Sequence, residues 1–168
     1  MAIETIFADG FESYSATVDL NDFGRWTYLG IGSLSSTGGR NGGAAMLMSS
    51  VKPYIDLNAA GFKTVVAGAA IKTPATISAG TIMGFADVAE YNLVHGIYMN
   101  SSGYLMYRYG NNFKTAGTTQ LQPSTWYYLE IRIYLDNSSG EYEIKINGTT
   151  EVTETGVDTH AFVTATTF

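Results

Sequence analysis

Two carboxylates in the C-terminal third of the chain have a spacing that hydrolytic chemistry can use. Glu141 and Glu143 stand two residues apart, so their side chains would point to the same face of a β-strand. A retaining glycosidase needs two carboxyl groups about 5 Å apart, one as acid and one as nucleophile. Lys145 is the next residue on that face, however, and the segment begins directly after a turn. We therefore interpret the pair as part of a solvated face and predict that the chain is not an enzyme.

Other residues with catalytic or metal-binding side chains are sparse. Glu130 is followed two residues later by Arg132, which favours a cross-strand or diagonal ion pair. His95 lies in an apolar segment, where a hydrogen-bonded core or interface histidine is more common than a ligand, and His160 stands near the C-terminal end. Neither has another His or a Cys at ligand spacing, so we expect no transition-metal site.

One short segment offers hard oxygen ligands, which Ca²⁺ prefers in proteins. It contains Asp19, Asn21 and Asp22. Residues of these types also favour turns, which explains the segment without a metal, and we favour that interpretation. A calcium site is the alternative, and no other cofactor is expected.

Aromatic residues form 13% of the chain, and 12 residues are tyrosines. Tyrosine stacks on the faces of sugars and anchors protein interfaces at a low entropic cost. Ordinary cross-strand pairing within a sheet accounts for tyrosines equally well. The candidates for an interface or a sugar-stacking surface are Trp26, Tyr98, Tyr104, Tyr128 and Tyr134.

Composition limits the classes of partner. Only 14% of the residues are charged and the formal net charge is −6, which argues against nucleic acid, because phosphate binding needs clustered Lys and Arg. No polybasic or long apolar segment favours a membrane, and the absence of cysteine excludes disulfides. The N-terminal residues lack the basic and apolar regions of a signal peptide, so we expect a soluble product made in a cytoplasm.

Alternation of apolar and polar residues with a period of two predicts β-strands along most of the chain. The clearest example is 126–136, whose expected core face carries Tyr127, Leu129, Ile131, Ile133 and Leu135. Segment 140–146 alternates in the same way. Asn147-Gly148 then favours a type I′ hairpin turn, which leads to a short return strand at 151–152.

The same pattern predicts further strands at 3–7, 26–31, 44–48, 54–57, 64–71, 81–85, 94–99 and 104–109. A turn at 100–103 joins the last two, 38–43 is a glycine-rich loop, and 87–91 is long enough for one helical turn. Many short strands separated by turns are typical of a sandwich or a jelly roll. We therefore expect one all-β domain over 1–168, a two-sheet antiparallel sandwich.

Three segments carry a resemblance to a known family. They are FADGFE at 7–12, GGAAM at 42–46, and WYYLEI at 126–131 followed by GEYEIKING at 140–148. They resemble the concanavalin A-like lectin and glucanase superfamily in its laminin-G-like form, and their order is similar to that in sandwich domains of virion proteins from tailed bacteriophages. The resemblance implies a jelly roll of two curved sheets, which usually closes with a final strand beside the first. Here 163–168 either forms that strand or pairs with another subunit.

The resemblance, the low charge and the tyrosines lead to a ranked set of expected functions. The first is a non-enzymatic structural protein of a phage particle, a capsid decoration or cement protein or a tail-associated domain. Such a protein would form homo-oligomers and contact other virion proteins. The alternative is a carbohydrate-binding module for adsorption to the host, and a glycoside hydrolase comes third.

Overall fold

The structure is a computed structural model, which describes residues 32–35, 37–48, 63–87, 93–159 and 165–167. Within those ranges the regular elements are all strands, and no helix is present that could cross a bilayer. Backbone contacts divide the chain into two compact units, Met1–Asn58 and Ala59–Thr166. A single domain over 1–168 stays a prediction.

In the first unit the described residues form one antiparallel hairpin. Its strands are β1 (Gly32–Ser35) and β2 (Ala45–Met48), and Ser35 pairs with Ala45 next to the connecting loop. In that loop the Gly39 N–H donates to the Gly43 carbonyl over 2.7 Å. The predicted loop at 38–43 and the strand after it are thus confirmed, whereas β1 was not predicted.

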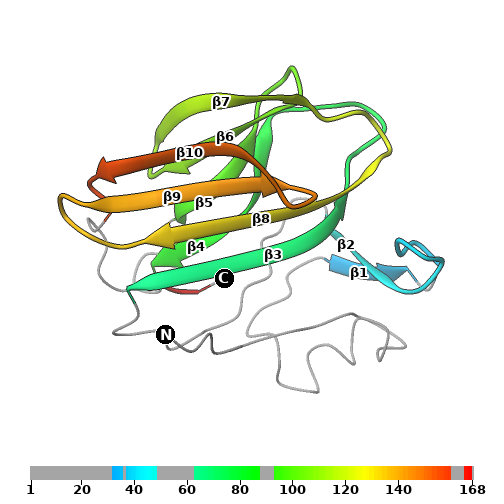
Figure 1. Ribbon diagram of the computed structural model, residues 1–168. Helices are drawn as coiled ribbons and strands as arrows, with labels where there is room; N and C mark the ends of the chain where they lie inside the picture. Colours follow the sequence, from blue (N-terminus) through cyan, green and yellow to red (C-terminus); the bar gives the residue numbers. More distant parts are fainter. Residues whose placement is uncertain (1–31, 36, 49–62, 88–92, 160–164, 168) are drawn as a thin grey trace. The chain divides into compact units, whose positions relative to one another are not determined.

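The second unit contains two antiparallel sheets, which face one another as two layers (Figure 1). The four-stranded sheet has the order β10-β9-β8-β3, and the five-stranded sheet has the order β11-β4-β5-β6-β7. The four-stranded sheet consists of β3 (Thr64–Lys72), β8 (Trp126–Tyr134), β9 (Gly140–Ile146) and β10 (Thr149–Val157). The five-stranded sheet consists of β4 (Gly80–Asp87), β5 (Leu93–Met99), β6 (Tyr104–Tyr109), β7 (Asn112–Gln120) and β11 (Ala165–Thr167). The predicted all-β sandwich is confirmed.

The core lies between the two sheets and is built by the predicted alternation. Leu129, Ile131 and Ile133 of β8 are fully buried, and Ile131 pairs with Ile144 on the neighbouring strand. The strand ends at Tyr134, two residues before the end of the predicted segment 126–136. Leu135 therefore lies beyond β8, where it is half-buried and its N–H donates to the Lys63 carbonyl over 2.7 Å.

The turn between β9 and β10 has the predicted geometry. Asn147 and Gly148 have φ angles of 51° and 84°, the two positive values that a type I′ turn requires. The return strand is longer than expected, because β10 continues to Val157. It contains register shifts at Thr150/Val152 and Thr155/Val157, which interrupt the alternation that the sequence analysis relied on.

Strand β7 was missed by the sequence analysis, which predicted no strand between 109 and 126. Apart from Phe113 its side chains are polar or small, and most are exposed, so no apolar alternation marks it. Gly117 is buried, and the Glu151 side chain of β10 lies against it. The Glu151 carboxylate accepts hydrogen bonds from the N–H and the hydroxyl of Thr119. This contact joins the edge strands of the two sheets.

Glu151→Ala is expected to destabilise the sandwich by about 1–2 kcal/mol, because Thr119 loses a charged acceptor for two donors. Gly117→Ala should cost a similar amount, since a Cβ at this position would lie 2.9 Å from Glu151 Cδ and displace the carboxylate. Urea unfolding of both single variants and the double variant measures the coupling. The exposed Thr155→Ala serves as the control. We expect the double variant to cost little more than either single one, and full additivity would refute the shared contact.

The C-terminal segment contributes β11, which lies at the edge of the five-stranded sheet beside β4. The expected partner of a closing strand at 163–168 was the first strand, whereas the described residues 165–167 pair with β4 instead, and pairing with another subunit stays untested. The predicted strands at 3–7, 26–31 and 54–57, and residues 88–91 of the predicted helical turn, lie outside the described residues.

Candidate functional site

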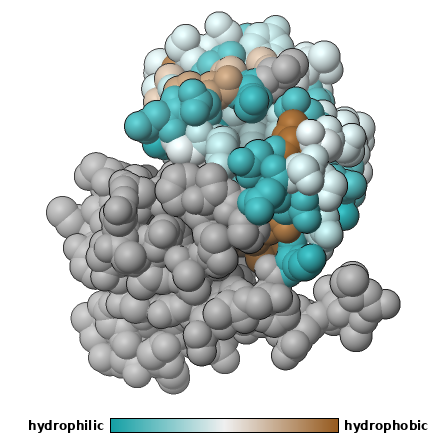
Figure 2. Space-filling model, turned by 90° about the vertical axis from the view of Figure 1, so that its left-hand side faces the viewer, coloured by the Kyte–Doolittle hydropathy of each residue, from teal (hydrophilic) through white to brown (hydrophobic). Residues whose placement is uncertain are grey.

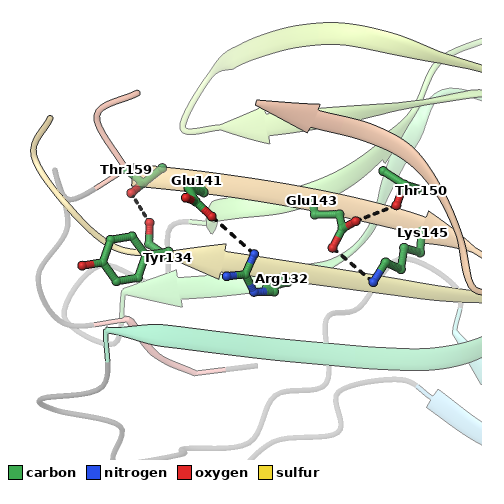
Figure 3. Close-up of polar contacts among 7 residues, drawn as sticks. All are labelled: Arg132, Tyr134, Glu141, Glu143, Lys145, Thr150 and Thr159. Carbon is green, nitrogen blue, oxygen red and sulfur yellow. Dashed lines mark hydrogen bonds and ion pairs between the residues drawn. The ribbon is translucent and has the colours of Figure 1, made fainter. Parts of the chain in front are cut away.

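The outer face of the four-stranded sheet carries the carboxylates that the sequence singled out (Figure 3). Five charged side chains of β8 and β9 form a network that we call the ion-pair ladder: Glu130, Arg132, Glu141, Glu143 and Lys145. Lys145 Nζ lies 3.1 Å from Glu143 and 3.7 Å from Glu130, and Arg132 lies 3.5 Å from Glu141. The expected cross-strand and diagonal pairing is thus confirmed.

The geometry of the ladder does not suit Glu143 to acid catalysis. The Thr150 hydroxyl donates to the Glu143 carboxylate over 2.6 Å. This hydrogen bond and the neighbouring Lys145 lower the pKa of Glu143, whereas a general acid needs a raised pKa. Both Glu141 and Glu143 therefore have cationic partners, which supports the interpretation of a solvated, ion-paired face.

Two of the predicted interface tyrosines, Tyr128 and Tyr134, lie on this same outer face. Tyr128 is 40% exposed, and its hydroxyl lies over Gly68 of the neighbouring strand β3. Val66, two residues before that glycine, is 57% exposed. We call Val66, Gly68, Ala70 and Tyr128 the apolar strip. It runs along the edge of the sheet beside the ion-pair ladder.

The other two tyrosines, Tyr98 and Tyr104, lie on the outer face of the five-stranded sheet. The Tyr98 ring packs against Phe113 with 4.4 Å between ring centroids and an interplanar angle of 46°. Arg108 lies over the same Phe113 ring, 6.0 Å from its centroid, and donates to the Thr81 hydroxyl. The structure therefore divides the four tyrosines between opposite faces. Phe113 was missed because it belongs to the unpredicted strand β7.

Two groups of predicted site residues cannot be placed. Trp26 and the calcium candidates Asp19, Asn21 and Asp22 lie outside the described residues, as does His160. Among the described residues, no group of three or more Asp, Glu or His side chains is arranged to hold a metal ion.

A chain of polar side chains crosses the core between the sheets, and the sequence analysis did not anticipate it. His95 and Tyr107 come from the five-stranded sheet, and His95 Nδ1 lies 2.5 Å from the Tyr107 hydroxyl. The Tyr107 ring stacks on Tyr142 of the other sheet at 3.6 Å between centroids, and the Tyr142 hydroxyl donates to Glu154. The alternation predicted that Tyr107 and Tyr142 point inward. A single sequence does not show which residues of the two sheets meet in the core.

Burial governs the protonation of this chain. Desolvation lowers the pKa of His95 to about 4, although the Thr159 carbonyl and the Asp158 carboxylate oppose the shift. His95 Nε2 has no hydrogen-bond partner within the part of the chain that the structure describes. Desolvation also raises the pKa values of Tyr107 and Tyr142, so both phenols stay protonated at neutral pH.

A pocket of about 450 Å³ opens at the end of the sandwich where β6 turns into β7. Tyr107, Tyr109 and Tyr142 line it, together with Asn112, Lys114 and Asp158. The segment that carries the aspartate is fixed by its neighbour Thr159, whose hydroxyl donates to the Tyr134 carbonyl over 2.6 Å (Figure 3). Figure 2 faces the end of the sandwich where β8 stops, and its coloured surface is mostly hydrophilic with small separate hydrophobic areas.

Comparison with known proteins adds no relative to this geometry. No protein-family model, no curated protein and no solved structure matches the chain.

Proposed function

We propose that the chain is a non-enzymatic structural protein of a tailed-bacteriophage particle, a capsid decoration or cement protein or a tail-associated domain. It acts through contacts with other virion proteins and with copies of itself. The observation that carries the proposal is the apolar strip beside the ion-pair ladder. The phage setting rests on the resemblance of segments 7–12, 42–46 and 126–148 to virion sandwich domains.

The outer face of the four-stranded sheet has the physical properties of a protein interface. Val66 and Tyr128 expose apolar surface. Gly68 has no side chain and Ala70 a small one, so a flat partner can approach the strand closely. The adjacent charges are already paired with one another, which lowers the cost of bringing a partner near them. An apolar centre with a polar rim is the usual arrangement of an interface.

Val66→Lys is expected to weaken self-association at least about ten-fold, because it places an unpaired charge in the apolar strip. The matched control is Thr153→Lys, which adds the same charge to exposed β10 of the same sheet, beside Glu143. Sedimentation velocity over a range of concentrations measures the dissociation constants. Equal association of the wild type and Val66→Lys would remove the apolar strip from the proposal.

The second candidate function is carbohydrate binding, and the outer face of the five-stranded sheet favours it. Phe113 is 46% exposed and Tyr98 packs against it, with Arg108 beside the pair as a hydrogen-bond donor. An exposed ring flanked by polar groups is the arrangement on which the apolar face of a sugar stacks.

Phe113→Ala should reduce the affinity for a bound neutral oligosaccharide about ten-fold, through loss of the stacking ring. Tyr128→Ala on the opposite sheet is the control and should leave that affinity unchanged. Calorimetric titration with the strongest ligand from a glycan array gives both values. An array without any signal at high protein concentration would eliminate this candidate.

A further inference from the structure

The end pocket contains a combination of side chains that the outer faces lack. Three tyrosines and Phe113 line it, and the polar lining residues are Asn112, Lys114 and Asp158. We propose that this pocket binds an organic cation, the ammonium or guanidinium head of a small molecule or of an Arg or Lys side chain. The lining residues come from β6, β7, β9, β10 and the segment after β10, and none comes from β3 or β8, which carry the apolar strip; Phe113 is shared with the second candidate surface. The inference is therefore independent of the proposed function.

Aromatic rings form much of the pocket lining. Aromatic faces attract cations through the ring quadrupole, and pockets with several aromatic rings are used to bind ammonium groups. The accessible rings in the lining are those of Phe113, which is 46% exposed, and the half-buried Tyr109, whereas Tyr107 and Tyr142 are buried and stacked on each other. Hydrogen bonds and stacking hold Tyr107 and Tyr142 in place, so the pocket is preformed and little ordering opposes binding.

The charged groups around the pocket favour a cation over an anion. Two carboxylates act on its lining: Glu154 accepts a hydrogen bond from the Tyr142 hydroxyl, and Asp158 is itself a lining residue. Glu154 contributes to the raised pKa values of Tyr107 and Tyr142, as a nearby negative charge must. Lys114 of β7 is the opposing charge. With two carboxylates and one ammonium the surroundings carry one net negative charge, and the whole chain is acidic as well.

The positive charge of Lys114 provides a specific test of cation binding. Lys114 is a lining residue, so its positive charge opposes the entry of a cation. Lys114 has an exposed side chain and no ion pair among the described residues. Removing its charge should strengthen cation binding, an effect that a merely structural lysine would not produce.

Tetramethylammonium chloride is the first probe, titrated into the full chain and followed by two-dimensional NMR. Saturable shifts of the Asn112 and Lys114 amides at millimolar concentration are expected, at constant ionic strength set with sodium chloride. Lys114→Gln should raise the affinity about five-fold, and Asp158→Asn should lower it about five-fold. The control Lys72→Gln removes a positive charge from β3 and should change nothing.

A second arm distinguishes the two sources of the cation. If the pocket binds a protein-borne side chain, the peptide Gly-Arg-Gly should bind more tightly than free methylguanidinium, whereas equal affinities indicate a small-molecule site. Failure of every cation to shift the pocket amides would overturn the proposal. So would saturable binding of acetate that Lys114→Gln abolishes, because the pocket would then be an anion site. If Asp158→Asn does not fold, the affinity of Lys114→Gln for tetramethylammonium alone tests the proposal.

Discussion

Lowering the pH from about 7 to about 4.5 is expected to cost the folded protein about 2 kcal/mol through His95 alone. The pKa of this imidazole is about 4 in the fold, below the ordinary value of 6.5, because burial disfavours its charged form. The unfolded chain therefore binds a proton at a higher pH than the folded chain does. The stabilising effect is complete above about pH 6.5 and is lost as the pH falls from there towards 4.

The carboxylates do not obscure this window. Hydrogen bonds lower the pKa of Glu143 and of Glu151, so their contributions are lost only below the ordinary carboxylate range of about 4.5. Urea unfolding at a series of pH values from about 7 to about 4.5 measures the slope. His95→Asn, which keeps an acceptor near the Tyr107 hydroxyl, should flatten it. A slope unchanged in His95→Asn would disprove the assignment.

Ile131→Ala should destabilise the second unit by about 3–4 kcal/mol, the largest effect that we expect from a single substitution. Ile131 is fully buried in the central strand of the four-stranded sheet and lies between Ala67 of β3 and Ile144 of β9. Truncation leaves a cavity in a rigid sheet that has little freedom to collapse.

Glu130→Ala, one residue away on the outer face, gives the comparison. Its carboxylate lies 3.7 Å from Lys145 and is partly exposed, so its loss should cost no more than about 1 kcal/mol. Chemical unfolding of both variants at neutral pH measures the difference. Equal costs would mean that the inward and outward faces of β8 are wrongly assigned.

The parts of the fold that follow from local patterns were predictable. Buried and exposed residues alternate without a break along β8 and β9, and Asn147-Gly148 favours the tight turn that joins β9 to β10. The parts set by contacts between distant strands were not. Strand β7 has no apolar periodicity and is held through Thr119 by Glu151, a residue of another sheet.

The candidate sites divide in the same way. Alternation placed Tyr98, Tyr104, Tyr128 and Tyr134 on outward faces, but it could not show that the two sheets separate them into two surfaces. The pocket could not be predicted from the sequence. Its wall residues become neighbours only after the two sheets have packed against each other.

The most direct test of the proposed function is the mass of the wild-type protein in solution, measured by light scattering over a range of concentrations. One chain has a mass of 18.1 kDa. If the apolar strip and the paired charges beside it form an interface, the mass should rise with concentration to a fixed multiple of that value. A mass of 18.1 kDa at every concentration would contradict self-association and shift the weight to carbohydrate binding.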